Sequence, residues 1–495
     1  MGQHLPIGSV PGHYASRFGP ERWALEHNGE SMSWAELERR ANARAWALAA
    51  RGVDRDDIVM LSLPNGNALY ELTFAIWKCG ATPCVVSSKL PLAEIKAITE
   101  LARPRLIVAA DAALALAIGA MPVSFGLDLG DERPFPARTP KHWKAMPSGG
   151  STGRPKIIVD HQPGIVDLGV APGMGLPEGK VVLNPGPCHH NAPFSFSHLA
   201  LGRGNSLVGM VKFDAEQALD LIERRGVAWV NFVPTMMNRI WRLPEVVRAG
   251  ANLSSLERVW HMAAPMPPWL KEAWIDWIGP EKIWEYYGGT ERQGATVISG
   301  EEWLTHRGSV GRPVDCQLRI LDERGRPLPA GQIGEIFLLP SGGKGSTYHY
   351  LGASARQVGL YESIGDHGWL DADGYLYLAD RRTDVIVSGG VNIYPAEIEN
   401  ALMEYPGIDG AVVIGLPDDD MGARVHAIVR RSPAIAEPPS EEALRAFLGE
   451  RLVRYKIPRS IEFTDDQLRD DAGKVRRGQL REARIGKTMR EALPL

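Results

Sequence analysis

A nine-residue stretch, Ser148 to Lys156 (SGGSTGRPK), combines glycines, hydroxyl side chains and a lysine. Backbone N–H groups in such a loop, together with Ser and Thr hydroxyls, can surround phosphate oxygens. The Walker A pattern places its lysine directly after the second glycine, at the start of a helix. Here Arg154 and Pro155 intervene, and Pro155 removes a backbone donor and disfavours helix at Arg154. The stretch therefore predicts phosphate binding unlike that of P-loop kinases and GTPases; a Gly/Ser-rich surface turn is the alternative.

Other polar residues follow predicted strands or sit in turns. Thr290 and Glu291 come just past the predicted strand KIWEY, and a carboxylate there suits Mg²⁺, which prefers oxygen ligands and substrate phosphates. Asp366 lies in a turn and suits a ribose diol, and the SGG of residues 388–390 puts glycines at a strand-to-helix transition. Lys474 lies in a turn near the C-terminus. Each has an ordinary alternative, such as a turn-forming aspartate or a solvated lysine.

Alternating strands and helices are expected to position these residues. A helix starts at the capping pair Ser33 and Glu36 and stops at Gly52. Apolar strands at 57–63, 81–87 and 105–111 alternate with helices, which predicts a parallel sheet covered by helices.

A second unit further along the chain shows the same alternation of strands and helices. A helix capped by Asp214 and Gln217 ends at Gly226, and strands at 227–235, 256–265 and 282–289 follow. Closely spaced turn signals over residues 308–340 predict a β-rich subdomain. A compact α/β unit begins near Thr383, so we expect domains at 1–382 and 383–495.

Composition excludes several classes of protein. The 495 residues carry a net charge of −4, which disfavours a nucleic-acid-binding protein. The four cysteines form no CxxC pair, so a zinc or disulfide framework is not expected. The N-terminus lacks the apolar run of a signal peptide, and we expect a cytoplasmic protein without a stable membrane anchor.

Taken together and in this order, the motifs resemble those of the adenylate-forming superfamily, which includes acyl-CoA synthetases, adenylation domains of nonribosomal peptide synthetases and beetle luciferases. The resemblance covers nearly the whole chain. It implies an α/β fold, with a large N-terminal domain of two α/β sheet subdomains plus a β-rich subdomain, and a small mobile α+β C-terminal domain. It also implies that Mg²⁺-ATP activates a carboxylic acid to an acyl-adenylate, which passes the acyl group to a thiol, usually coenzyme A. Homodimers occur in such a family.

The resemblance also implies roles for residues at the nucleotide. The residues that match the loop for the β- and γ-phosphates are Ser148, Gly149, Ser151, Thr152, Gly153 and Lys156, whereas Gly150 stands where the family usually has threonine. The residues that match the adenine, ribose, α-phosphate and Mg²⁺ contacts are Ala263, Ala264, Pro265, Tyr287, Gly288, Thr290, Glu291, Asp366 and Arg381. The nucleotide site is thus drawn from residues 148–381 of the N-terminal domain.

The resemblance implies that Lys474 and the SGG turn of the C-terminal domain act one after the other, in the two steps of the reaction. Lys474 matches the lysine that bridges the acid carboxylate and the α-phosphate, where a cation offsets the repulsion of two anions. Ser388, Gly389 and Gly390 match the turn that approaches pantetheine after a domain rotation. Thr383 stands where the family commonly has Asp or Lys, and it is the hinge candidate.

A histidine-rich segment resembles the entrance of the family's acid pocket. His190 matches the gate, and the candidate wall residues are His189, Asn191, Phe194 and Gly289. Phe232 and Val233 are apolar where amino-acid-activating members carry an aspartate. The segment most resembles bacterial CoA ligases for bulky cyclic acids, such as aryl, steroid or bile acids. The alternatives are a medium- or long-chain fatty acyl-CoA ligase, an enzyme that loads an acyl carrier protein, and a non-catalytic nucleotide-binding protein.

Overall fold

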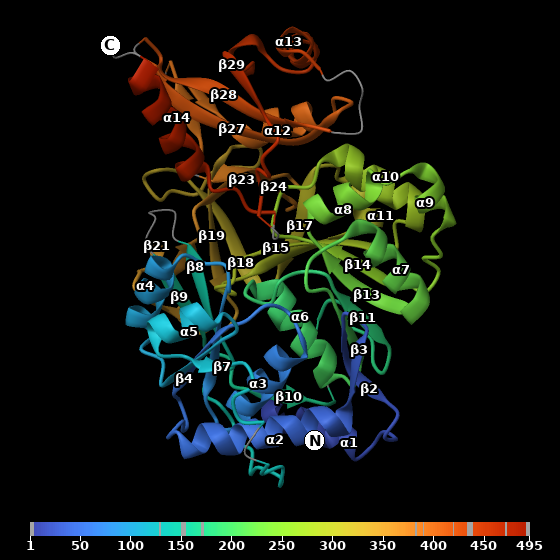
Figure 1. Ribbon diagram of the computed structural model, residues 1–495. Helices are drawn as coiled ribbons and strands as arrows, with labels where there is room; N and C mark the ends of the chain where they lie inside the picture. The colour runs from blue at the N-terminus through green and yellow to red at the C-terminus, as the bar shows by residue number, and fades with distance from the viewer. Residues whose placement is uncertain are drawn as a thin grey trace.

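The structure, a computed structural model, describes residues 4–127, 130–149, 155–169, 173–381, 384–389, 391–418, 420–432, 439–470 and 473–491. The residues discussed above that lie outside these ranges are Gly150, Ser151, Thr152, Gly153, Arg154, Thr383 and Gly390. At Gly149 and Arg381 the structure describes the backbone alone. Figure 1 shows a large N-terminal body with a smaller C-terminal unit, orange to red, above it.

A seven-stranded sheet forms the first subdomain, in the order β20-β9-β8-β5-β4-β6-β7. Its core strands pair in parallel, as the alternation of strands and helices predicted, whereas β8–β9 and β9–β20 are antiparallel. The strands are β4 (Ile58–Ser62), β5 (Thr82–Val86), β6 (Leu106–Ala109), β7 (Met121–Pro122), β8 (Ala145–Gly149), β9 (Pro155–Asp160) and β20 (Tyr348–Leu351). The helices along this part of the chain are α3 (Asn67–Lys78), α4 (Leu92–Ala102) and α5 (Ala112–Ile118).

The second sheet has fifteen strands and joins the second α/β unit to the β-rich region. Its parallel part comprises β2 (Trp23–His27), β12 (Ser206–Gly209), β11 (Val181–Asn184), β13 (Val227–Phe232), β14 (Arg258–His261) and β15 (Ile283–Gly288). The remaining strands are β3 (Glu30–Ser33), β16 (Ala295–Ser299), β17 (Ser309–Val314), β18 (Cys316–Leu321), β19 (Gly334–Pro340), β21 (Arg356–Val358), β22 (Tyr361–Ser363), β23 (Asp366–Leu370) and β24 (Leu376–Arg381). The β-rich subdomain is therefore continuous with the α/β part of the second sheet, because β17 pairs with β24.

Side-chain caps start two of the predicted helices. The Ser33 hydroxyl accepts from the Glu36 N–H at 3.1 Å, and Asp214 accepts from the Gln217 N–H at 2.9 Å. Such a cap contributes about 1 kcal/mol. Gly226 ends the second helix with φ = 61°, a left-handed conformation that glycine adopts at little cost. The helices of this region are α1 (Val10–Ala15), α2 (Trp34–Ala50), α6 (Asn191–Gly202), α7 (Ala215–Arg225), α8 (Pro234–Trp241), α9 (Glu245–Gly250), α10 (Pro268–Ile278) and α11 (Gly300–Thr305).

The C-terminal unit has its own sheet and its own apolar core. The sheet runs β27-β28-β29, and a separate hairpin joins β25 to β26. Its core includes Ile398, Val413, Ala427 and Leu444, all buried, which agrees with the predicted small C-terminal domain. Its elements are β25 (Ile386–Ser388), β26 (Val391–Ile393), α12 (Pro395–Met403), β27 (Ile408–Asp418), β28 (Gly422–Arg431), α13 (Glu441–Gly449), β29 (Ser460–Thr464) and α14 (Arg477–Glu491).

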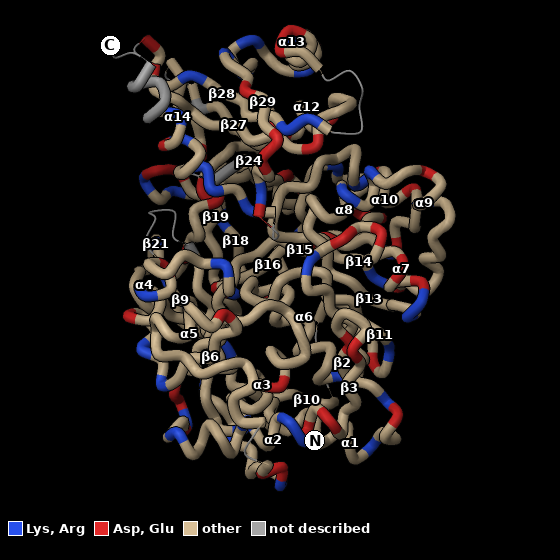
Figure 2. Tube along the Cα trace, in the orientation of Figure 1, with Lys and Arg blue, Asp and Glu red and all other residues tan. Residues whose placement is uncertain are grey.

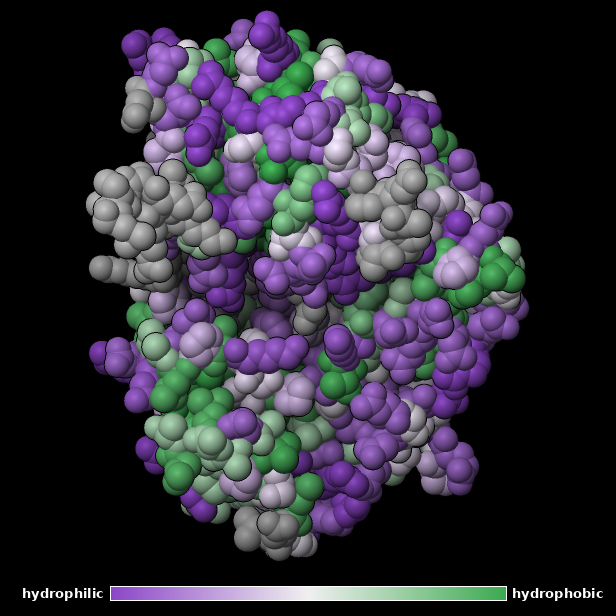
Figure 3. All heavy atoms as spheres, turned by 45° about the horizontal axis from the view of Figure 1, so that its top comes forward, coloured by the Kyte–Doolittle hydropathy of each residue, from purple (hydrophilic) through white to green (hydrophobic). Residues whose placement is uncertain are grey.

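The surface gives a general view of charge and shape. In Figure 2, basic and acidic residues are interspersed on the side shown. Figure 3, which brings the C-terminal unit forward, shows a hollow in the middle of this face, bordered mainly by hydrophilic residues. Among the described residues, no helix combines the length and the apolar character needed to cross a membrane.

Candidate active site

The predicted phosphate loop connects two antiparallel strands. Ser148 pairs with Lys156 and Gly149 with Pro155 across β8 and β9, so these two strands form an antiparallel hairpin. A Walker A loop instead leads from a strand into a helix. The hairpin therefore confirms that this stretch is not a P-loop of the kinase type. Since Lys156 stands near the beginning of β9, the hairpin holds its backbone close to the loop.

Lys156 meets two residues that are distant in sequence. Its Nζ lies 3.2 Å from the Glu291 Oε1 and donates to the Tyr350 hydroxyl at 3.0 Å. The Tyr350 hydroxyl donates to the same Glu291 oxygen at 2.6 Å, and its ring centroid lies 4.2 Å from the Lys156 Nζ. The structure thus brings together the predicted phosphate lysine and the predicted Mg²⁺ carboxylate. Sequence reasoning missed Tyr350; its signal was the alternation of Tyr348 and Tyr350, which places both on one face of β20.

Glu291 is held in a confined place just after β15. Its side chain is 7% exposed, and a Cβ at Gly289 would stand 2.7 Å from the Glu291 Oε2. Gly289 therefore leaves room for the carboxylate. Burial and the negative charge of Glu291 raise the pKa of Tyr350 far above its usual value, so Tyr350 stays protonated and keeps donating. Thr290, which lies between Gly289 and Glu291 in the chain, is half-buried.

The residues predicted to contact adenosine also gather. The Tyr287 hydroxyl, at the end of β15, donates to the Asp366 Oδ2 at 2.9 Å. Asp366 on β23 is paired in register with Arg381 on β24, so their backbones lie side by side. Ala263 follows β14 with φ = 74°, a left-handed conformation that costs a residue with a Cβ about 1–3 kcal/mol and that recurs at functional sites. Tyr287 and Asp366 are therefore in direct contact, and Arg381 is the backbone neighbour of Asp366.

The Lys474 loop of the C-terminal unit docks against the N-terminal body beside Thr235 and Ala264. Gly473 has φ = 75°, and a Cβ there would lie 3.4 Å from the Thr235 Oγ1 and 3.6 Å from the Ala264 Cβ. The Lys474 N–H donates to the Asp470 Oδ1 at 2.9 Å, which shapes the turn. Two further contacts join the two parts: Arg242 donates to the Ile408 carbonyl at 2.9 Å, and Arg476 lies 3.6 Å from Glu94.

Lys474 is close enough to the predicted gate for its charge to act there. Burial, followed by the charges of His189 and Lys474, holds the pKa of His190 well below its usual value, so His190 is neutral near pH 7. The predicted pantetheine turn makes different contacts: the Gly389 N–H donates to the Met421 carbonyl within the C-terminal unit, at 2.8 Å. The structure therefore brings the Lys474 loop to the predicted site, and the role of Lys474 in adenylation stays a prediction.

The predicted acid-pocket residues surround the start of α6. His190 precedes the helix, with its ring centroid 4.3 Å from that of His189. Phe194 is fully buried in the core, where its ring faces His198 at 4.3 Å and Trp77 at 6.0 Å. Its role as a pocket wall, like those of His189 and Asn191, stays a prediction.

Sequence reasoning missed a buried lysine beside this helix. Lys144, 1% exposed, donates to Asn191 and, at 2.7 Å, to the Ser195 hydroxyl. Its Nζ lies 3.6 Å from Asp160, which also pairs with Arg292 at 3.0 Å. Burial lowers the pKa of Lys144 to about 8, because the apolar surroundings disfavour its charged form. Lys144 therefore connects the start of α6 to Asp160 at the end of β9, and Asp160 in turn contacts Arg292, the residue after Glu291.

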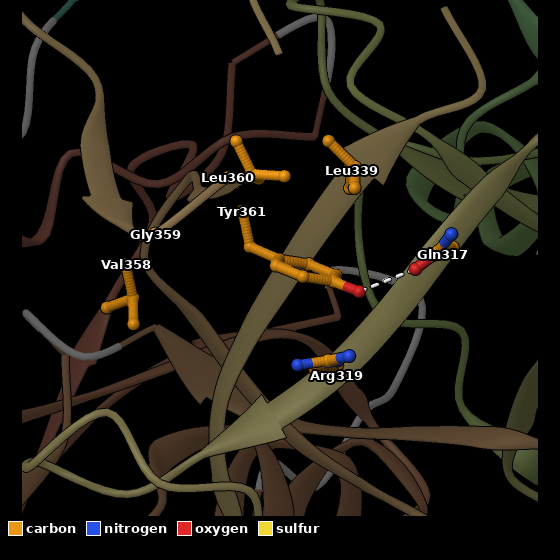
Figure 4. A pocket seen from close by; sticks show the side chains of 7 residues that line it. All are labelled: Gln317, Arg319, Leu339, Val358, Gly359, Leu360 and Tyr361. Atoms are coloured by element: carbon orange, nitrogen blue, oxygen red, sulfur yellow. Dashed lines mark hydrogen bonds between the residues drawn. The ribbon is translucent and has the colours of Figure 1, made fainter. Parts of the chain in front are cut away.

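A surface hollow of about 490 Å³ lies elsewhere, on the β-rich part (Figure 4). Inside it, the Tyr361 hydroxyl donates to the Gln317 Oε1 at 2.6 Å, and the Arg319 guanidinium lies 4.5 Å from the Tyr361 ring. The residues that line it are Gln317, Arg319, Leu339, Val358, Gly359, Leu360 and Tyr361, none of which was predicted to contact nucleotide or acid. We assign these contacts to packing of β18, β19 and β22.

Comparison with known proteins identifies the family of both parts of the chain. Residues 13–342 match the AMP-binding enzyme family, and residues 397–474 match the AMP-binding enzyme C-terminal domain. A feruloyl-CoA synthase from Amycolatopsis sp is 33% identical, over 96% of this chain and 98% of that protein. A fatty acid–[acyl-carrier-protein] ligase from Streptomyces coeruleorubidus is 29% identical, over 95% of each chain.

The fold has close counterparts among solved structures. The o-succinylbenzoate CoA synthetase from Bacillus subtilis, in complex with its acyl-adenylate intermediate, superposes with a TM-score of 0.80 at 25% identity, over 97% of this chain and 98% of that one. The matches therefore extend over both the N-terminal body and the C-terminal unit. From its sequence, its fold and the residues gathered at this site, the chain belongs to the AMP-binding enzyme family.

Proposed function

We propose that the protein is an AMP-forming acid–CoA ligase that acts on a bulky cyclic carboxylic acid. One observation carries the proposal: the Lys156–Glu291 pair, the Tyr287–Asp366 pair and the Lys474 loop come from distant parts of the chain and converge on one region. These are the groups needed to hold triphosphate, ribose and an attacking carboxylate. Relatives named as aryl-acid CoA ligases support the same reaction.

The reaction has two steps. The acid's carboxylate oxygen forms a bond to the α-phosphorus of ATP, and the bond to pyrophosphate breaks. The thiol of coenzyme A then forms a bond to the acyl carbon, AMP leaves, and the thiol proton passes to solvent or a base. Lys474 stabilises the negative charge that builds on the α-phosphate in the first step. Lys156 and the loop before it hold the departing pyrophosphate.

The residues present fit a Mg²⁺ ion beside the triphosphate. Mg²⁺ is usually bound through one or two carboxylates together with substrate phosphates. Glu291 supplies such a carboxylate: its Oε1 bonds to Lys156 and Tyr350, and its Oε2 lies against Gly289, where a Cβ would stand 2.7 Å away. When bound, the ion would neutralise phosphate charge. Lys156 is then available to the phosphates, since it need not neutralise Glu291 by itself.

The class of acid rests on the pocket entrance and on the relatives. The names of two relatives, feruloyl-CoA synthase and 2-succinylbenzoate–CoA ligase, refer to aromatic acids. His190, neutral near pH 7, places no positive charge of its own at the gate. Asn191, fixed by Lys144 and Ser195, supplies polar contacts at the same entrance.

A carrier protein is the second candidate acceptor. A relative at 29% identity is named as a fatty acid–[acyl-carrier-protein] ligase, so the same adenylation chemistry can serve another thiol. Release of AMP that depends on coenzyme A would favour the first candidate; release that requires an acylatable carrier protein would favour the second. The division at residues 382 and 383, the hinge at Thr383, a cytoplasmic location and a homodimer stay predictions.

The Lys474→Ala variant tests the mechanism. Acid-dependent ATP–pyrophosphate exchange should fall steeply, while thioester formation from a preformed acyl-adenylate should survive, because Lys474 acts in the first step. A screen of aryl, steroidal and fatty acids with the unaltered protein tests the substrate class. Equal losses in the two half-reactions would overturn the role of Lys474, and preference for linear fatty acids would overturn the acid class.

A further inference from the structure

Arg292, the residue after Glu291, has a backbone conformation that residues with a Cβ rarely adopt. Its φ is 55°, and its N–H donates to the Gly289 carbonyl at 3.1 Å. Its Nη1 donates to the Asp160 Oδ1 at 3.0 Å. Such conformations persist only where the surrounding contacts enforce them, and they cluster at functional sites. The turn and the contact with Asp160 therefore hold the chain directly after the predicted Mg²⁺ carboxylate.

Asp160 lies on the same face of β9 as Lys156. Lys156, Ile158 and Asp160 are alternate residues of this strand, so their side chains point to one face. Lys156 contacts Glu291 across this face, and Asp160 contacts the next residue along the chain. The position of Glu291 therefore depends on Asp160 as well as on Lys156.

The other oxygen of Asp160 connects it to the helix at the predicted acid entrance. The Asp160 Oδ2 lies 3.6 Å from the Lys144 Nζ. Lys144 in turn donates to the side chains of Asn191 and Ser195 at the start of α6. A series of contacts therefore runs from the start of α6 through Lys144 and Asp160 to Arg292. It joins the predicted entrance for the acid to the predicted Mg²⁺ carboxylate.

The three charges of this series alternate in sign, and two of them are buried. The side chains of Lys144 and Asp160 are 2% and 1% exposed, whereas that of Arg292 is 40% exposed. Burial alone would raise the pKa of Asp160, but the charges of Lys144 and Arg292 outweigh burial and hold this pKa below its usual value. Asp160 is therefore an anion shared by two cations. Charges in a protein interior are screened less than charges in water, so a shift of Lys144 changes how firmly Asp160 holds Arg292.

We propose that Asp160 is a positioning residue through which binding of the acid and binding of Mg²⁺-ATP strengthen each other. This inference rests on the proposed function. An acid at the entrance orders the start of α6 and thereby Lys144. Lys144 in turn fixes the contact between Asp160 and Arg292, next to the predicted Mg²⁺ ligand. Because coupling between two binding sites is reciprocal, each ligand raises the affinity for the other by the same factor.

Binding of α,β-methylene-ATP with Mg²⁺ to the full-length protein tests the proposal, because adenylation cannot cleave this nucleotide. Calorimetry at pH 7, below the pKa of about 8 of Lys144, gives its Kd without acid and with a saturating acid. The acid is the one that supports the fastest ATP–pyrophosphate exchange in the screen described above. In the wild type, we expect the acid to lower the Kd about fivefold or more. The ratio of the two Kd values is the readout, because a general loss of nucleotide affinity cancels in it.

Arg292→Gln is the main variant, because the Arg292 side chain is partly exposed and its replacement should leave the fold intact. In this variant and in Asp160→Asn, the acid should no longer change the Kd. Arg292→Lys keeps the positive charge beside Asp160 and should retain part of the effect. Glu362→Gln is the matched control: Glu362 accepts from Gln293, the residue after Arg292, at 3.1 Å, so it anchors the same segment from the β-rich part. The control should keep the wild-type ratio.

The proposal is overturned if the acid leaves the Kd of the wild type unchanged, or if Glu362→Gln loses the ratio as fully as Arg292→Gln. It is also overturned if Arg292→Gln or a folded Asp160→Asn keeps the wild-type ratio. Circular dichroism checks the fold of each variant, and the Arg292 variants decide the matter if Asp160→Asn does not fold. Absence of exchange with every acid of the screen would instead overturn the proposed function, and this inference with it.

Discussion

Replacing Tyr350 by phenylalanine should impair adenylation selectively. The substitution keeps the ring that lies 4.2 Å from the Lys156 Nζ but removes the hydroxyl that donates to Glu291 at 2.6 Å. A hydrogen bond to a charged group contributes about 1.5–3 kcal/mol. When ATP is bound and Lys156 contacts the phosphates, the Tyr350 hydroxyl is the donor among the described residues that still orients the Glu291 carboxylate. Removing this hydroxyl should therefore weaken the ATP-bound state.

The magnitude follows from that energy. Each 1.36 kcal/mol changes a rate about tenfold, so kcat/KM for ATP in the first half-reaction should fall roughly tenfold to a hundredfold. Acid-dependent ATP–pyrophosphate exchange at varied ATP measures this value. The KM for the acid should change little, because Tyr350 contacts Glu291 and Lys156 rather than the residues around His190.

Tyr348→Phe supplies the control on the same strand. The Tyr348 hydroxyl donates to Glu362 at 3.0 Å and accepts from Gln293, instead of bonding to Glu291. This variant should melt at a lower temperature and keep its kcat/KM for ATP. The reasoning is refuted if Tyr350→Phe retains wild-type exchange, if both variants lose the same factor, or if thioester formation from preformed adenylate falls equally.

Two further outcomes test the electrostatics of the site. Lys474→Met should raise the pKa of His190, because the charge of Lys474 is one of the causes that lower it. The ¹⁵N chemical shifts of the His190 imidazole, followed against pH, measure this pKa. An unchanged pKa would contradict docking of the Lys474 loop in solution. Lys144 has a pKa of about 8 in the folded protein against 10.5 as its ordinary value, so between these values the unfolded chain binds more protons and folding stability should rise with pH. The melting temperature of the wild type should therefore rise relative to that of Lys144→Met from pH 8 to 10, and parallel pH profiles would count against a buried, charged Lys144.

Local signals allowed much of the fold to be predicted. Ser33 and Asp214 cap their helices as expected, because a capping side chain and its backbone partner are three residues apart. The parallel strands of both sheets were predicted from short apolar runs between helices, since strands buried on both faces carry few polar residues. Pro155 correctly excluded a Walker A loop, because its effect on the backbone is local.

Contacts across the sequence could not be predicted in the same way. Tyr350 reaches Lys156 because β20 leaves the β-rich region and pairs with β9, and no local pattern specifies that partner. In the sequence, nothing distinguishes Lys144 from an ordinary surface lysine before the phosphate loop. In the structure, it is buried against Asn191 and Asp160. The family resemblance provided the residues of known motifs, whereas these supporting residues required the three-dimensional arrangement.

The pairing of β20 with β9 also constrains the order in which the protein can fold. Tyr348 to Leu351 cover the outer edge of a sheet whose other strands end at Asp160, so about 190 residues are synthesised while β9 lacks its neighbour. An uncovered strand edge is a template for pairing with other chains. The match to the N-terminal family ends at residue 342, so a chain cut there would leave the apolar Ile157, Ile158 and Val159 along a permanent open edge. The physical folding unit therefore extends at least to Leu351, beyond the boundary that sequence similarity defines.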